Sequence, residues 1–169
     1  YVSLFLNTAP FMIYFGEEVG EKGMDEEGFS GKDGRTTIFD WWSVGTVRRL
    51  RKVIESKAYE SMDVKTLVKA GMKKEEAEVF VRFAEATRLA SSDLAVTKGT
   101  TYDLCYCNFS SDGFDKNRHY IFLRDHEEHT LLIAANFSNR EARMKIRIPE
   151  HAFEWMGIPV TDSLNPGTV

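Results

Sequence analysis

The sequence APFMIYFGEEVG, residues 9–20, decides how this chain is interpreted. Residues 11–15 are apolar without interruption, and Gly16 ends the run. A short run that is apolar on both faces predicts a strand buried on both sides, as in a parallel sheet covered by helices. Glu17 and Glu18 follow at once, and α/β folds place their chemistry at the carboxyl ends of such strands. The stretch therefore predicts a buried strand with a candidate site at its end.

The composition and charge of the chain argue against nucleic-acid and membrane partners. The 169 residues are 43% hydrophobic, with 22 Lys and Arg against 26 Asp and Glu, for a net charge of −4. A nucleic-acid-binding face needs clustered basic charge, so we expect no nucleic-acid partner. No apolar run approaches the roughly 20 residues of a membrane-spanning helix, so we expect no membrane partner either.

Three helices are expected between this strand and residue 98. The first has apolar residues 44, 47, 50 and 54 at helical spacing, with Ser43 as its N-cap. Its basic residues, including Arg49, are expected on a solvated face, with an anion site as the alternative. A short helix should run from Asp63 to Gly71, and the longest over residues 74–90.

From residue 101 the pattern changes from helical to alternating. Strands are expected over residues 101–108, 118–125, 129–137 and 142–148, joined by short polar turns. The third is apolar on both faces and is expected at the centre of the sheet. Short connections predict an antiparallel meander that forms part of a β-sandwich. The fold class expected for the chain is therefore α+β.

The cysteine and histidine residues give little indication of a disulfide or a metal site. Cys105 and Cys107 would share one strand face nearly 7 Å apart, at or beyond disulfide reach, and two buried thiols are expected. A metal pair formed by His119 and His129 across the hairpin is one alternative, and exposed strand-end histidines are the other. The sequences Asn-Phe-Ser at 108 and 136 are glycosylation sequons, although Asn and Ser at strand ends also form turns.

Two motifs resemble the α-amylase family (family 13) of glycoside hydrolases. The first resembles the eighth barrel strand of that family, with the pattern G-x-P-x-x-Y-Y-G-x-E-x-G, although Ala9 and Phe15 depart from it. The positions that match are Tyr14, Gly16, Glu18 and Gly20, and Pro10 stands one residue before the proline of the pattern. The second, YIFLRDHEEHTLLIAANFS at residues 120–138, is similar to a hairpin of the family's C-terminal β-domain.

This resemblance implies a domain organisation and three site residues. Residues 1–98 would form the C-terminal end of a (β/α)8 TIM barrel, and residues 99–169 an antiparallel β-domain that lacks its last hairpin. Glu18 matches a structural carboxylate near the substrate cleft. Residues 35–41 resemble the family's R-x-P-M-x-W motif, whose arginine lies near the sugar-binding cleft. Arg35 matches this arginine, and Trp41 stands one residue later than the tryptophan of the motif, so both are candidate substrate-binding residues.

The resemblance also implies a function. The chain would be the C-terminal part of an enzyme that hydrolyses α-glucosidic bonds in α-glucans or maltooligosaccharides with retention of configuration. The family's catalytic carboxylates would precede Tyr1, so the chain alone should be inactive and holds no catalytic or metal-ligating residue. We expect no cofactor, with Ca²⁺ in the longer enzyme as an alternative. The barrel strand, lacking its neighbours, would allow self-association.

A second interpretation belongs to another class. The chain could be a free-standing carbohydrate-binding or interaction module that uses aromatic residues such as Trp41, Trp42 or Trp155. Solvent-facing aromatic side chains would favour this interpretation, and buried ones would not.

Overall fold

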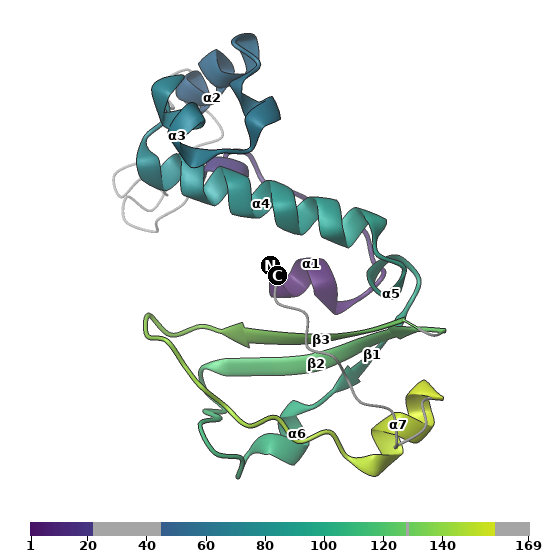
Figure 1. Ribbon diagram of the computed structural model, residues 1–169. Coiled ribbons are helices and arrows are strands. Elements are labelled where there is room, and N and C mark those ends of the chain that lie inside the picture. Colours follow the sequence, from purple (N-terminus) through teal and green to yellow (C-terminus); the bar gives the residue numbers. More distant parts are fainter. Residues whose placement is uncertain (22–44, 128, 158–169) are drawn as a thin grey trace, which may run out of the picture. The chain divides into compact units, whose positions relative to one another are not determined.

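The computed structural model describes residues 1–21, 45–127 and 129–157, which form a mixture of helices and one antiparallel sheet (Figure 1). The chain separates into two compact units, one of Phe11–Arg88 and one that joins Tyr1–Pro10 to Leu89–Val169. These units are groups of mutual contacts, and the domain division into residues 1–98 and 99–169 stays a prediction.

The unit of Phe11–Arg88 is helical. Its elements are η1 (Glu17–Val19), α2 (Gly45–Glu55), η3 (Ala58–Ser61), α3 (Val64–Lys69) and most of α4 (Lys74–Ser92). Their apolar faces meet in one core, formed by Val19, Leu50, Val53, Leu67, Met72 and Ala77.

The three helices expected from the sequence are confirmed in this unit. The Asp63 carboxylate accepts a hydrogen bond from the backbone N–H of Thr66 at 2.9 Å and so caps α3 at its start. Gly71 follows the helix with a φ of +119°. Ser43, the expected N-cap of α2, lies outside the described residues.

The second unit contains a three-stranded sheet with the order β1-β2-β3, formed by β1 (Thr100–Asp103), β2 (His119–His126) and β3 (His129–Asn136). Both pairings are antiparallel, and the β2–β3 hairpin pairs His126 with His129 and His119 with Asn136. The expected antiparallel hairpin is therefore confirmed.

The expectation that residues 129–137 are central is wrong. β2 is central, because it pairs with a strand on each side, and its residues Ile121–Arg124 are buried. β3 pairs with β2 alone among the described strands, and its residues alternate between exposed and half-buried.

Helices cover the two faces of this sheet. Figure 1 shows α6 (Cys105–Asn108) and α7 (Glu150–Met156) on one side of the sheet and α1 (Val2–Leu6) on the other. Ile121 and Leu123 pack with Leu104, Ala152 and Met156 in a second core. Because side chains alternate along a strand, Arg124 points to the opposite face, where it reaches Leu6 and Val96 at the ends of α1 and α5 (Leu94–Thr97).

The strand expected over residues 101–108 forms only as far as Asp103, and the expectation is wrong for the residues after it. β1 ends at Asp103, whose side chain accepts a hydrogen bond from the N–H of Cys105 at 2.8 Å, and the chain then forms α6. This local bond competes with the strand ladder. Cys105 and Cys107 therefore lie on one helical turn, as half-buried free thiols.

Residues 142–148 alternate in burial as expected but do not form a strand. The side chains of 142, 144, 146 and 148 are half-buried, and those between them are exposed. Their backbone meets α6 and the turn after it rather than a strand. Lys145 N–H donates to the Asp112 carbonyl at 2.9 Å, and the Arg147 backbone bonds the Asn108 side chain.

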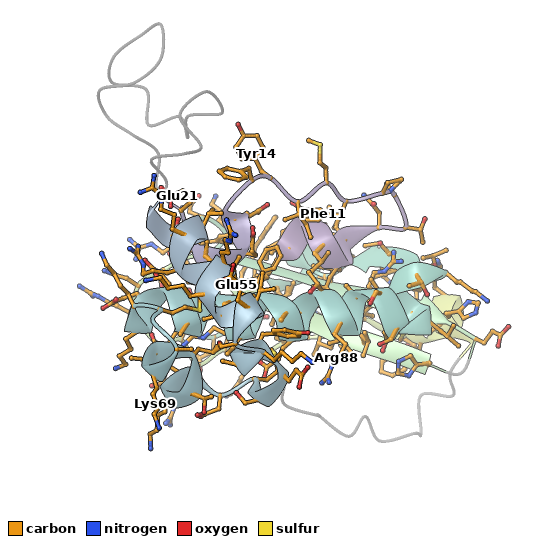
Figure 2. All side chains as sticks on the ribbon, turned by 90° about the horizontal axis from the view of Figure 1, so that it is seen from above. Phe11, Tyr14, Glu21, Glu55, Lys69 and Arg88 are labelled. Carbon is orange, nitrogen blue, oxygen red and sulfur yellow. The ribbon has the colours of Figure 1, made fainter. Side chains whose placement is uncertain are left out.

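The strand expected over residues 11–15 is also wrong. This segment has no regular structure, and its five large side chains are 39% to 81% exposed (Figure 2). A strand needs a backbone partner for its N–H and C=O groups, and no described strand pairs with residues 11–15.

Candidate functional site

The residues that end the opening motif form a tight turn. Gly16 and Gly20 have φ values of +82° and +65°, in the left-handed region that favours glycine, and they flank the single turn η1. The Glu17 carboxylate accepts the N–H of Tyr14 at 3.0 Å, and Glu21 N–H donates to the Gly16 carbonyl at 3.0 Å. Val19 lies in the core, which fixes the turn to the helices.

The structure places one of the three predicted site residues. Glu18 is half-buried in the η1 turn, while the hydrogen bond that holds the preceding backbone comes from its neighbour Glu17. Arg35 and Trp41 lie outside the described residues. The proximity of these three residues, and their roles at a substrate cleft, therefore stay predictions.

A pocket of about 470 Å³ opens beside this turn, within the unit of Phe11–Arg88. Val19 and Val79 give it an apolar surface, and its other side chains are polar or charged: Glu21, Thr46, Arg49, Lys73, Glu75 and Glu76. Glu21, which continues from the turn, hydrogen-bonds the hydroxyl of Thr46 on α2. The pocket is thus framed by the motif turn and by the starts of two helices.

An ion pair between Arg49 and Glu76 dominates the electrostatics of this pocket. Arg49 Nε lies 2.8 Å from Glu76 Oε2, and Nη2 lies 2.5 Å from Oε1. This bidentate hydrogen bond lowers the pKa of Glu76 against the opposing effect of burial, and it raises the pKa of Arg49. Both groups are therefore charged at neutral pH, and Glu76 is poorly suited to act as a proton donor or acceptor.

Glu76 also fixes the start of α4. Its carboxylate accepts the backbone N–H of Lys73 at 3.1 Å, as the third residue of a helix does in a capping box. The pattern of basic residues in the sequence predicts Arg49 on a solvated face, and it does not indicate this pair. The one sequence feature that could have indicated a role for Glu76 is its place in the first turn of an expected helix, where a carboxylate commonly accepts the backbone N–H of the N-cap residue.

A second group of polar aromatic residues lies on the sheet-containing unit. Tyr102 on β1, Tyr106 on α6 and His151 and Trp155 on α7 form the aromatic cluster. Of these four residues, only Trp155 was a candidate binding residue from the sequence. The spacing of four residues between His151 and Trp155 could have indicated a shared helix face, but α7 was not among the expected elements.

The described residues hold no group of three or more side chains suited to bind a metal ion. His119 and His129 make separate contacts, because His119 Nδ1 accepts the N–H of Asp115 at 2.9 Å and His129 Nε2 lies 2.8 Å from Asp93 Oδ2. Across the part of the chain that the structure describes, no helix has the length and apolarity that crossing a membrane requires.

We compared the chain with known proteins by sequence and by structure. No family model matches the sequence, and neither the curated proteins nor the solved structures include a significant match to this chain.

Proposed function

We propose that this chain is the C-terminal part of an α-amylase-like glycoside hydrolase that acts on α-glucans. The observation that carries the proposal is the turn at residues 16–20. Both glycines of the motif have the left-handed backbone that favours glycine, and a β-carbon on Gly16 would lie 2.7 Å from the β-carbon of Glu21. The motif therefore reflects a backbone requirement at these positions.

The exposed apolar segment, which lies in the same stretch as this turn, is a second feature that supports the proposal. Burying one large apolar side chain stabilises a protein by about 1.5–3 kcal/mol, and a domain is stable by only about 5–15 kcal/mol. Five such side chains in a row, from Phe11 to Phe15, are exposed here. The neighbouring strands of a (β/α)8 barrel would cover them on both sides.

The second motif also has a structural basis. Residues 120–138 form the β2–β3 hairpin, and the Asn136 side chain ends it. Asn136 Oδ1 accepts the N–H of Ser138 at 2.9 Å, and Nδ2 donates to the Arg140 carbonyl at 2.8 Å. The Asn-Phe-Ser sequence therefore works here as a turn.

The proposal assigns a supporting role to this chain. A retaining glycosidase uses two carboxyl groups about 5–5.5 Å apart, one as nucleophile and one as acid and base. We assign these groups to other parts of the longer enzyme. Residues 1–98 would form the end of its TIM barrel, with Glu18, Arg35 and Trp41 on one wall of the cleft, and residues 99–169 would form its β-domain.

Hydrolysis of maltoheptaose tests this proposal. The full polypeptide encoded by the gene should release products that first appear as α-anomers in ¹H NMR spectra, and the 169-residue chain alone should release none above a heat-inactivated control. A full polypeptide without activity on α-glucans, or one that yields β-anomers first, would contradict the proposal. Activity of the short chain would contradict the supporting role.

A free-standing carbohydrate-binding module is the second candidate. The exposed rings of the aromatic cluster favour it, because Tyr106 and Trp155 face solvent. The two candidates differ in the activity of the full polypeptide, since a binding module would retain the glucan without cleaving it.

A further inference from the structure

The aromatic cluster joins three elements through rings and hydrogen bonds. The Tyr102 ring lies 5.2 Å from Trp155 and 5.7 Å from His151, measured between ring centres. The Tyr102 hydroxyl is 2.8 Å from that of Tyr106, which is 2.8 Å from His151 Nε2. Partial burial and the Tyr106 hydrogen bond raise the pKa of Tyr102 to about 12, so the Tyr102 hydroxyl stays protonated at neutral pH.

The core beneath the cluster fixes the two α7 rings. His151 and Trp155 lie four residues apart and share one face of the helix. Ala152 and Met156, the next residue after each, are buried against Leu104 and the β2 side chains. The rings are therefore held in place before any ligand arrives, which lowers the entropic cost of binding.

The exposed part of the cluster combines flat apolar faces with polar edges. Tyr106 is 47% exposed and Trp155 is 40% exposed, so both rings can be reached from solvent. Within the described residues His151 uses Nε2 alone, so Nδ1 of its exposed ring can bond a ligand hydroxyl. Sugar rings present apolar C–H faces and hydroxyl rims of the same kind.

Charge and ring geometry discriminate between classes of ligand. The residues flanking the cluster in sequence include the carboxylates Asp103, Glu150 and Glu154, which disfavour the phosphates of a nucleic acid. A cage for a quaternary ammonium group needs rings around an open centre. Here Tyr102 fills that centre by packing on Trp155. A neutral ligand with a stacking face fits both observations.

We propose that the aromatic cluster binds a neutral α-glucan chain, with a glucose ring stacked on Trp155 and hydroxyls bonded to Tyr106 and His151. The choice of an α-glucan rests on the proposed function, whereas the sugar-binding surface rests on the cluster itself. The site is separate from Glu18 in sequence and lies on the other compact unit. It would hold the polymer on the protein without cleaving it.

Binding is measured by calorimetry with the unmodified 169-residue chain, in which the aromatic cluster keeps all of its rings. Maltoheptaose should bind saturably, and substitutions in the cluster should raise its dissociation constant. Trp155→Ala should weaken binding at least about tenfold, and Tyr106→Phe about threefold, because it keeps the ring and loses the hydroxyl. Phe137→Ala is the matched control, since Phe137 is an exposed ring of the same unit outside the cluster.

Thermal unfolding of each variant accompanies the titrations. If Trp155→Ala does not fold, Tyr106→Phe and His151→Ala decide the result. Unchanged affinity in the folded cluster variants, or no binding of maltoheptaose at millimolar concentration, would overturn the proposal. Cellohexaose bound in place of maltoheptaose would overturn the α-glucan assignment at this surface. The hydrolysis assay tests the proposed function independently of either result.

Discussion

Asn108 shows how one buried side chain replaces a missing strand. Its amide nitrogen donates to the carbonyls of Leu104 at 2.8 Å and Arg147 at 2.9 Å. Its oxygen accepts the Arg147 N–H at 2.7 Å and the Ser111 hydroxyl at 2.8 Å. The N–H and C=O groups of Arg147 therefore have the hydrogen-bond partners that a neighbouring strand would supply. Residues 142–148 keep their alternating burial although no strand pairs with them.

Asn108→Ala should lower the free energy of unfolding by about 2–4 kcal/mol, because it leaves buried backbone groups without partners. Urea denaturation of the chain measures this change. Ser111→Ala is the control, since it removes only one half-buried bond and should cost about 0.5–1 kcal/mol. Equal losses in the two variants would show that Asn108 does not replace a strand.

The Arg49–Glu76 pair makes a pH-dependent contribution to stability. The pKa of Glu76 is lower in the folded chain than in the unfolded chain, chiefly because Arg49 bonds its carboxylate. A group of this kind stabilises the fold at pH values above its unfolded pKa of about 4.3. That contribution is lost as the pH falls through the lower folded value.

Glu76→Gln should therefore lower the free energy of unfolding by about 1–2 kcal/mol at pH 7. The difference from the unmodified chain should shrink below about pH 4.3, where the carboxylate of the unfolded chain is protonated. Glu55→Gln, which breaks an exposed ion pair with Arg51 on α2, should cost less than about 0.5 kcal/mol. A pH-independent cost for Glu76→Gln would exclude the ion pair as its cause.

At the scale of elements, Arg124 connects two short helices to the sheet. It is 1% exposed on the central strand β2, and its Nη2 donates to the Val96 carbonyl at 2.7 Å. Its Nη1 lies 2.6 Å from Thr101 Oγ1 and 3.4 Å from the Leu6 carbonyl. Carbonyls near helix C-termini carry partial negative charge, so the ends of α1 and α5 compensate this buried cation.

Arg124→Met should weaken the attachment of α1 to the sheet, because the Leu6 carbonyl then keeps only its bond from the Thr101 hydroxyl, while leaving the hairpin formed. Methionine fills much of the volume but cannot bond Leu6, so the amides of Leu4 and Phe5 should exchange hydrogen at least about tenfold faster. The β2–β3 amides should change much less. Arg118→Met, at an exposed arginine before β2, should leave both rates unchanged. Equal acceleration of α1 and the hairpin would indicate global unfolding instead.

At the scale of the whole molecule, residues 11–15 form an exposed apolar segment that neither a core nor a strand covers within the described residues. Its side chains are apolar and its backbone has no strand partner among the described residues. In the isolated chain a second copy can supply the missing partner.

We therefore expect the isolated chain to self-associate through this segment. Sedimentation equilibrium should give an average mass that rises over about a hundredfold range of concentration, as mass action requires. Met12→Lys with Ile13→Lys should abolish the rise, and Phe137→Lys, at an exposed ring elsewhere, should not. A concentration-independent monomer mass for the unmodified chain would contradict self-association.

The sequence by itself determined the helices α2, α3 and α4 of this protein. The Asp63 cap, the glycine after α3 and the apolar stripe of α4 gave their positions closely, because each helical hydrogen bond closes within four residues. The sequence also determined which side chains of residues 142–148 turn inward, since alternation follows from an extended backbone alone. The turn around Glu18 is equally local.

Only the tertiary structure decided which extended segments become strands. A strand needs a partner that is distant in sequence, and residues 11–15 and 142–148 have no strand partner within the described chain. The same dependence put β2 rather than β3 at the centre, and brought Arg147 to Asn108 across 39 residues. The aromatic cluster also depends on contacts between segments that are distant in sequence. Folding brings α7, with His151 and Trp155, to Tyr102 on β1 and Tyr106 on α6.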